Sequence, residues 1–406
     1  MATSRTRVIS QSKAVFVSPT GIQASVDSGY IPDQLHRIDT FSFDIDIAGA
    51  RQDIREFGQL ARIDTLTMSE LNPSLSFGYY LTDGENEARL GFNDDGIVDG
   101  APTGVLSQFV SGILTEDADK KVKNLYVLTA KEGNDAFNSG ELIKPANRAL
   151  CDAVSFGNVT INNYSASFAV GDIPRVDIEA EASNILFTTE AYSGFNNPSI
   201  NDGGAQQAGV VALAAVSADT TTPFQAPSTG DSAITVLKPE DLTISFSSPS
   251  FDMGGTNFSD MHIQSASVDV PLARGNIEAL GKARAVAKPL EFPIDVTMSF
   301  SSLLKNFDDG ALDLVLTGTA GDQKTDITLK IKNKVGIDQN TFVLKDAVLD
   351  SQAFSQGLDD NETVDLTFSA QIGGPDTTGQ GLFYSGAFDG VVDAINAPNK
   401  TYTIGS

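Results

Sequence analysis

Apolar and polar residues alternate with a period of two along much of this chain, and this pattern limits the folds that the chain can adopt. It recurs between residues 41 and 370, in runs rich in Val, Ile, Thr and Phe that lie between Gly, Asn and Asp turns. Such runs are typical of half-buried β-strands. We therefore predict a mainly β chain, with strands at 41–47, 74–81, 124–130, 174–182, 241–247, 265–272, 294–301, 325–331 and 362–370.

The second half of the chain repeats the pattern of the first. Residues 42–81 align with 265–304 at an offset of 223 without a gap, and nine of these 40 pairs are identical, whereas average composition gives about two or three. Residues 156–182 align with 344–370 at an offset of 188. The decrease from 223 to 188 places 35 extra residues in the first copy, after Leu81. Phe16 and Phe246 extend the match at an offset of 230.

This repeat predicts a domain organisation with two tandem, similar modules. The Gly, Ala, Ser and Thr-rich stretch between them indicates a linker or surface excursion, in which 209–216 is either a short strand or a helix. Within the insert, a short helix is expected near 105–114. The predicted parts are an N-terminal arm at 1–13, module 1 at 14–185, the linker at 186–240, module 2 at 241–372 and a C-terminal tail at 373–406 with a possible last strand at 401–404.

Few residues are available for catalysis or for metal binding. Cys151 is the only cysteine, which excludes an internal disulfide, and the two histidines, His36 and His262, give no recognisable zinc site or nucleophile–base arrangement. The loop at 91–104 fails the calcium-loop pattern because Gly104 stands where a Glu is needed, which leaves only an irregular calcium site near 91–100 open. We therefore predict no catalytic, cofactor-binding or metal-binding residues and no enzymatic activity.

The charge of the chain also limits its partners. The net charge is −26, which argues against tight binding to nucleic acid, because such binding needs a basic surface. It suits either simple solubility or a surface that must not hold a polyanion. No apolar run is long enough for a transmembrane helix, and the sequence begins without an apolar signal region, so we expect neither membrane insertion nor export.

Residues 50–64 place many charges among Ile54, Phe57, Leu60 and Ile63. In the second copy, 273–287, the charges change while the apolar spacing stays. We interpret the segment as structural, a short helix or a tightly packed loop that leaves the first strand of each module and packs against a neighbouring subunit. The predicted assembly interface is Arg51, Ile54, Phe57, Gly58, Arg274, Ile277, Leu280 and Gly281.

The blocks at 41–64 and 74–84, with their counterparts at 265–286 and 294–304, resemble the tail tube proteins of tailed bacteriophages, in the duplicated-module type found in long-tailed phages. The resemblance covers about three quarters of the chain at the level of pattern. It implies two β-sandwich or small-barrel modules, each with a short helix and a long loop. It also implies self-assembly into stacked rings, either trimers of duplicated chains or hexamers.

The function that this resemblance implies is that of a major tail tube subunit, whose hollow tube conducts phage DNA without binding it specifically. The expected partners are other copies of the chain, a tape-measure protein and tail terminator or baseplate proteins. The tube would assemble in the host cytoplasm and belong to the virion, without a cofactor. Two alternatives stay open: a β-sandwich adhesin or carbohydrate-binding virion protein, with aromatic contacts such as Tyr79, Tyr80, Phe383 and Tyr384, and a capsid or decoration protein.

Overall fold

The computed structural model describes most of the predicted strands and leaves several connecting segments undescribed. The described residues are 8–20, 33–48, 50–67, 72–82, 84–92, 106–114, 122–131, 151–188, 194–200, 210–212, 237, 242–247, 262–280, 285–303, 324–332, 338–355, 363–374 and 377–386. Most of these residues lie in β-strands, so the prediction of a mainly β chain is confirmed. The calcium candidate at 93–100 and the predicted strand at 401–404 lie outside the described residues.

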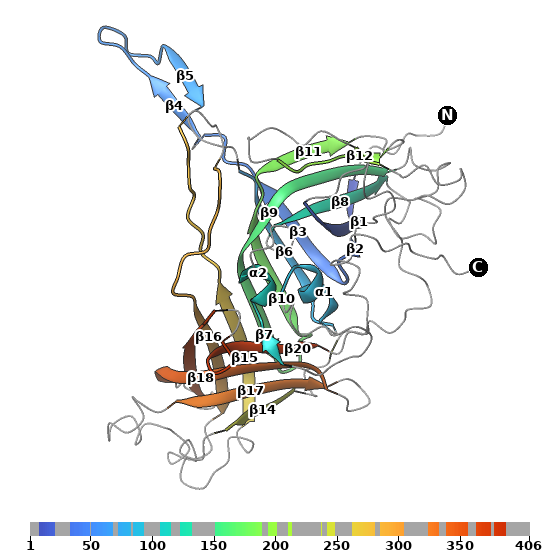
Figure 1. The fold of residues 1–406 in the computed structure, drawn as a ribbon, viewed down its shortest axis with the longest axis vertical. Coiled ribbons are helices and arrows are strands. Elements are labelled where there is room, and N and C mark those ends of the chain that lie inside the picture. The colour runs from blue at the N-terminus through green and yellow to red at the C-terminus, as the bar shows by residue number, and fades with distance from the viewer. Residues whose placement is uncertain are drawn as a thin grey trace, which may run out of the picture.

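Eight strands pair side by side in one antiparallel sheet, which we call the shared sheet (Figure 1). Four strands come from each half of the chain, and the two halves meet where β15 pairs with β9. In spatial order the strands are β18 (Asp338–Ser355), β19 (Thr363–Gln371), β16 (Asp295–Leu303), β15 (His262–Pro271), β9 (Cys151–Ala169), β10 (Arg175–Glu181), β6 (Ser74–Tyr80) and β3 (Ile38–Asp44).

The alternation in sequence gives the shared sheet one apolar and one polar face. On β19, for example, Val364, Leu366 and Phe368 are buried, while Asp365 points to the opposite side and is exposed. Antiparallel sheets of this kind pack one face on a core and leave the other face to solvent. The apolar face belongs to a single core that spans both halves of the chain.

Two further groups of strands cover the apolar face. The first group joins the first part of β9 and the second joins the first part of β18, so both long strands take part in two layers. Rings bridge these layers: Phe156 of β9 contacts Phe41 of β3, and Phe246 contacts Phe300 of β16. The first group is β1 (Val8–Pro19), β2 (Asp33–Gln34), β8 (Lys123–Lys131) and β11 (Asn184–Thr188); the second is β14 (Leu242–Phe246), β17 (Thr325–Lys332) and β20 (Gly381–Gly386).

The strand order of the first half recurs in the second half. The order β1, β8, β9, β10, β6, β3 corresponds to β14, β17, β18, β19, β16, β15. Every described pair between β9 and β10 recurs 188 residues later between β18 and β19, including the bulge that skips Asn162 in one case and Asp350 in the other. The left-handed residues Asn158 (φ 52°) and Asp346 (φ 59°) are also 188 residues apart, and Asn and Asp tolerate this conformation best among non-glycine residues.

The ungapped alignment at 223 is wrong by two residues in the first strand. The pairing of β3 with β6 and of β15 with β16 shows that Asp44, rather than Asp46, is the structural equivalent of Asp269. These two strands are therefore related by an offset of 225, and the bulges at Asp39 and Gln264 are separated by the same offset. The alternating pattern does not detect such an error, because a shift of two residues keeps every side chain on its face. From the hairpins onward the offset of 223 holds. The domain bounds inferred from the repeat stay a prediction.

The segment that was predicted as a short helix or packed loop is a projecting β-hairpin instead. Strands β4 (Arg51–Ile54) and β5 (Asp64–Thr67) pair with each other and extend away from the sheets (Figure 1). The three-residue spacing of Ile54, Phe57 and Leu60 suits a helix, but no core faces these side chains, and Gly58 takes φ 98° at the turn. An amphipathic helix needs such a packing surface to be stable.

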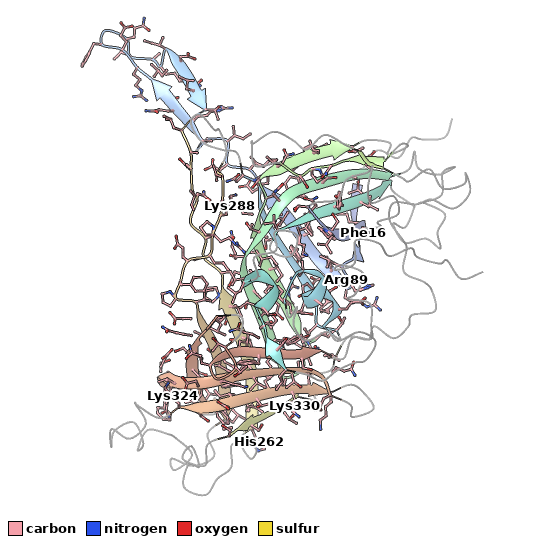
Figure 2. The ribbon with its side chains drawn as sticks, viewed as in Figure 1. Phe16, Arg89, His262, Lys288, Lys324 and Lys330 are labelled. Atoms are coloured by element: carbon pink, nitrogen blue, oxygen red, sulfur yellow. The ribbon has the colours of Figure 1, made fainter. Side chains whose placement is uncertain are left out.

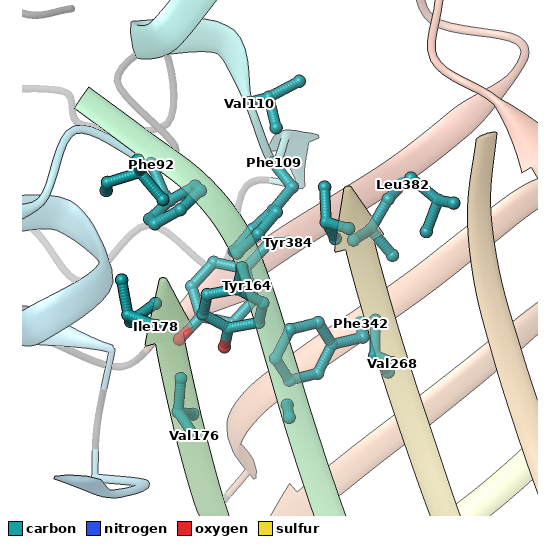
Figure 3. Packing of buried hydrophobic residues seen from close by; sticks show 14 of the residues in the cluster. Phe92, Phe109, Val110, Tyr164, Val176, Ile178, Val268, Phe342, Leu382 and Tyr384 are labelled. Atoms are coloured by element: carbon teal, nitrogen blue, oxygen red, sulfur yellow. The ribbon is translucent and has the colours of Figure 1, made fainter. Parts of the chain in front are cut away.

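The two described helices lie in the predicted insert. Helix α1 (Glu85–Arg89) and helix α2 (Ser111–Leu114) are short, and α2 falls where the sequence predicted a helix. Strand β7 (Ser107–Gln108) pairs with β20 of the second half. The insert therefore fastens the two halves together, and its Phe92 and Phe109 stack within a cluster that includes Tyr164, Phe342 and Tyr384 (Figure 3). A last pair of strands, β12 (Gly194–Asn196) and β13 (Val210–Ala212), makes part of 209–216 a short strand.

Candidate assembly surfaces

The polar face of the shared sheet consists mainly of hydroxyl and carboxylate side chains. Among the described strand residues on this face, Arg175 is the only lysine or arginine. We define the polar face by Ser42 and Asp44 (β3), Ser74 and Ser76 (β6), Arg175, Asp177 and Glu179 (β10), Ser165 and Ser167 (β9), Ser267 and Asp269 (β15), Asp295, Thr297, Ser299 and Ser301 (β16), Asp365, Thr367, Ser369 and Gln371 (β19), and Ser351 and Ala353 (β18).

The single arginine of this face is held by carboxylates. Its Nε atom lies 3.0 Å from Oδ1 of Asp177, and its guanidinium also pairs with Asp39. Burial alone lowers the pKa of Arg175, but the hydrogen bonds and charges of Asp177 and Asp39 outweigh it and raise the pKa. The guanidinium is thus committed to neighbouring carboxylates, and the face as a whole presents negative charge.

The polar face is also hollowed at the junction of the two halves. A depression of about 780 Å³ extends over β9, β10, β15, β16 and β19, and its lining includes Ser167, Ser267, Ser299 and Thr367. Across the same junction, the hydroxyl of Ser165 on β9 donates a hydrogen bond of 2.5 Å to Oδ1 of Asp269 on β15. No group of metal-ligating residues exists among the described residues.

The two outermost strands of the shared sheet end in open edges. Within the described residues, β3 pairs only with β6, and the second part of β18 pairs only with β19. Phe43 on β3 is 42% exposed and Phe354 on β18 is 40% exposed, although both side chains are on the apolar side of the sheet. Sequence reasoning missed these residues, because alternation reveals the face of a strand but not whether the strand is at an edge.

The predicted interface residues of the first hairpin are exposed. Phe57 is 106% exposed at the tip, Gly58 forms the turn beside it, and Arg51 and Ile54 lie on β4. Backbone bonds hold the hairpin together, for example from the nitrogen of Ile63 to the oxygen of Ile54 at 2.9 Å. Ile54, Leu60, Ile63 and Leu66 of this hairpin are exposed as well, and such a group of exposed apolar side chains is typical of a contact with another molecule.

A second, equivalent arm projects from the other half of the chain. Its bridges Arg274–Leu290 and Ile277–Ala287 lie 223 residues after Arg51–Thr67 and Ile54–Asp64. Leu280 is 107% exposed at the position that corresponds to Phe57. Gly281, the last predicted interface residue, lies outside the described residues.

Arg274 differs from its counterpart Arg51, because it anchors its arm to the first half of the chain. Its Nε donates to the carbonyl of Ile161 at 3.2 Å and its Nη1 to the carbonyl of Lys288 at 3.1 Å. Lys288 in turn lies 2.6 Å from a carboxylate oxygen of Glu181 on β10 (Figure 2). Burial lowers the pKa of Arg274 to about 10.

Charged residues of α1 are buried where the insert meets the first half. Glu85 pairs with Arg89 and lies 3.3 Å from His36. Burial raises the pKa of Glu85, but the hydrogen bond from His36 and the charge of Arg89 more than reverse this and lower the pKa. Glu87 accepts hydrogen bonds from the hydroxyls of Tyr79 at 2.9 Å and Tyr164 at 3.3 Å. These contacts position the insert against the core.

Three of the four aromatic residues named for the carbohydrate-binding alternative are not available at the surface. Tyr79, Phe383 and Tyr384 are buried. Tyr384 donates a hydrogen bond to Asn340 within the core. Of the aromatic contacts named for the adhesin alternative, only Tyr80 remains, partly buried at the depression on the polar face. In the described part of the chain, no helix is long and apolar enough to cross a membrane.

No protein-family model and no curated protein sequence matches the chain. The solved structures that align with part of it include three assemblies. They are the tail of an empty GTA particle with C6 symmetry (11% identity, 34% of this chain and 94% of that chain, TM-score 0.23), the six-fold symmetrised baseplate of the anti-feeding prophage (12%, 36% and 91%, 0.25) and the SPP1 tail tube (12%, 42% and 91%, 0.26). At these TM-scores the alignments do not establish a common fold.

Proposed function

We propose that this protein is a structural virion subunit, a major tail tube protein that assembles into stacked rings around a channel for phage DNA. The observation that supports it most directly is the polar face of the shared sheet. This face is hollowed, rich in hydroxyls and carboxylates, and continuous across both halves of the chain. The proposal assigns this face to the channel and assigns no catalytic role to any residue.

Electrostatics supports the proposed assignment. Duplex DNA carries a dense array of phosphates, and proteins hold it through lysine and arginine. The polar face presents Asp177, Glu179 and Asp365, and its arginine is already paired. Negative charge at the wall keeps the phosphates at a distance, so DNA passes without adhering.

The duplication suits a ring of three chains. Three copies supply six similar modules and about 24 strands of shared sheet, spaced about 4.8 Å apart and tilted about 40° when the sheet closes. That geometry gives a cylinder roughly 45–50 Å across between opposite backbones, which leaves room for a double helix after side chains are added. The partners in this role are other copies of the chain, a tape-measure protein, and terminator or baseplate proteins. Assembly takes place in the host cytoplasm.

Electron microscopy of the purified, concentrated full chain tests the proposal. We expect rings of three chains and stacked tubes with a central channel, because the open edges and both projecting arms need partners. As a control, the same protein is first dissociated by salt or pH and is then returned to assembly conditions. Closed shells would favour the capsid alternative, and monomers at every concentration would overturn the proposed function.

A further inference from the structure

The junction between the two halves of the chain joins one strand of each half edge to edge. Strand β15 pairs with β9 in antiparallel register, with Val268 opposite Ala166 and Asp269 opposite Ser165. Val268 and Ala166 are fully buried there. The junction thus continues the sheet and the core from one half of the chain to the other.

Both strands of this junction have an equivalent elsewhere in the chain. Register and bulges make β3 the equivalent of β15 at an offset of 225, and they make β18 the equivalent of β9 at an offset of 188. The β15–β9 junction uses one edge of each strand. The corresponding edges of β3 and of the second part of β18 are open within the described residues. Open edges readily pair with another chain.

Applying the two offsets to the observed junction gives a specific register. The pair Val268–Ala166 translates to Phe43–Phe354, and the pair Asp269–Ser165 translates to Asp44–Ala353. Phe43 and Phe354 then meet on the apolar side, and Asp44 and Ala353 meet on the polar side. The side-chain faces of the two strands therefore agree in this register, which a shift of one residue would reverse.

We propose that β3 of one copy pairs antiparallel with the second part of β18 of the next copy, with Ser42 opposite Ser355, Phe43 opposite Phe354 and Asp44 opposite Ala353. This inference rests on the proposed ring-forming function and specifies its lateral contact. The contact is head-to-tail, and such a contact closes a ring when the rotation between successive copies divides a full turn. Burying the two phenylalanine rings against each other stabilises this contact between copies.

A buried amide also lies at this edge. The side-chain nitrogen and oxygen of Gln352 are inaccessible to solvent and make no hydrogen bond in the described structure. Gln352 lies beside Phe354 on the open part of β18, opposite Ile45 in the proposed register. An unsatisfied buried amide costs free energy, and the backbone of an incoming β3 brings hydrogen-bonding groups to this edge.

Disulfide trapping tests the register. In a Cys151→Ser background, the double variant Phe43→Cys/Phe354→Cys places thiols on directly opposite residues, whose Cα atoms are about 4.5–5.5 Å apart in such pairs and within the span of a disulfide. Within one copy the two positions are seven strands apart, roughly 33 Å, so only links between copies form. We expect reducible dimers and trimers under oxidising conditions. The matched control, Asp44→Cys/Phe354→Cys, points its thiols to opposite faces and should form few links.

The possible outcomes separate this contact from the proposed function. Tubes in the microscope without Phe43→Cys/Phe354→Cys links would overturn the β3–β18 contact and leave the function standing. Equal linking in both double variants would overturn the register. Absence of tubes and links in every protein, including the unmodified chain, would overturn both.

A second pair of variants decides the question if the cysteine proteins fail to assemble. Phe354→Lys places a charge on the apolar side of the proposed joint, whereas Ala353→Lys places the same charge on the polar side, opposite Asp44. We expect Phe354→Lys to remain monomeric with an unchanged thermal midpoint and Ala353→Lys to assemble, as measured by analytical ultracentrifugation. Assembly of both variants would contradict the proposal.

Discussion

At the scale of single residues, the core contains polar groups that are buried together with their partners. The hydroxyl of Tyr126 is fully buried and lies 3.3 Å from that of Ser18, and burial raises the pKa of Tyr126 to about 12 despite the hydrogen bonds from Ser18 and Asn124. Burial, followed by the charge of Glu87, also raises the pKa values of Tyr79 and Tyr164. These tyrosines therefore stay neutral at pH values at which exposed tyrosines ionise.

This arrangement leads to a pH prediction. Between about pH 10 and about pH 12 the unfolded chain releases the Tyr126 proton while the folded chain retains it, so the free energy of unfolding falls as pH rises. We expect Tyr126 to contribute about 1.4 kcal/mol per pH unit to that fall. Urea unfolding of the wild type and of Tyr126→Phe at a series of pH values measures it. Equal slopes in the two proteins would contradict the raised pKa.

At the scale of elements, the two arms share one pairing register but differ in their contacts with the rest of the chain. The arms share their register at an offset of 223 and expose Phe57 and Leu280 at equivalent tips. The second arm is held at its base by Arg274 and Lys288, which contact the first half of the chain, and the described residues show no equivalent contact for the first arm. The sequence predicted the equivalence of the segments. It did not predict their conformation, because a hairpin that extends into solvent has no core to impose a recognisable period.

We expect Phe57→Asp and Leu280→Asp to impair assembly without unfolding the chain. Both side chains are fully exposed, so the free energy of unfolding should change by less than about 0.5 kcal/mol, while a charge at an apolar contact opposes burial against a neighbour. Sedimentation and thermal unfolding measure the two effects. The control is Gln59→Asp, on the same tip, which should assemble. If Phe57→Asp polymerised like the wild type, the tip would have no role in assembly.

At the scale of the whole molecule, the insert and the β15–β9 junction make the chain a preassembled pair of modules. Strand β7 of the insert pairs with β20, and the Phe92–Phe109 stack extends the core across the junction. Within the described residues, the shared sheet then keeps one pair of open edges, at β3 and at the second part of β18. A ring of such pairs needs fewer bimolecular steps than a ring of single modules.

The proposed channel predicts a charge effect that belongs to the assembled tube. Glu179→Lys adds cations to the polar face of every copy, and we expect the variant tubes to retain short duplex DNA at low salt and to release it as salt rises. Cosedimentation of DNA with tubes measures this. Asp338→Lys, at the start of β18 and away from the polar face, is the matched control. Equal retention by both variants would contradict the assignment of the polar face to the channel.

Several features could be read from the sequence because they depend on local pattern. Alternating runs located strands such as β3, β8, β10 and β19, since a half-buried strand needs an apolar residue at every second position. The comparison of the two halves located the repeat, and its offset of 188 recurs in the pairing of β9 with β10 and of β18 with β19. The net charge and the scarcity of histidine and cysteine favoured a role in assembly over catalysis.

Other features were decided only by the tertiary structure, because they depend on pairing between distant segments. The alternation within β15 is the same whether its neighbour is β9 of the same chain or a strand of another copy. The placement of β3 and β18 at the open edges, and with it the exposure of Phe43 and Phe354, follows from the order in which eight strands assemble. The sequence by itself determined which face each strand buries; the packing of both halves around one core determined which edges remain for a partner.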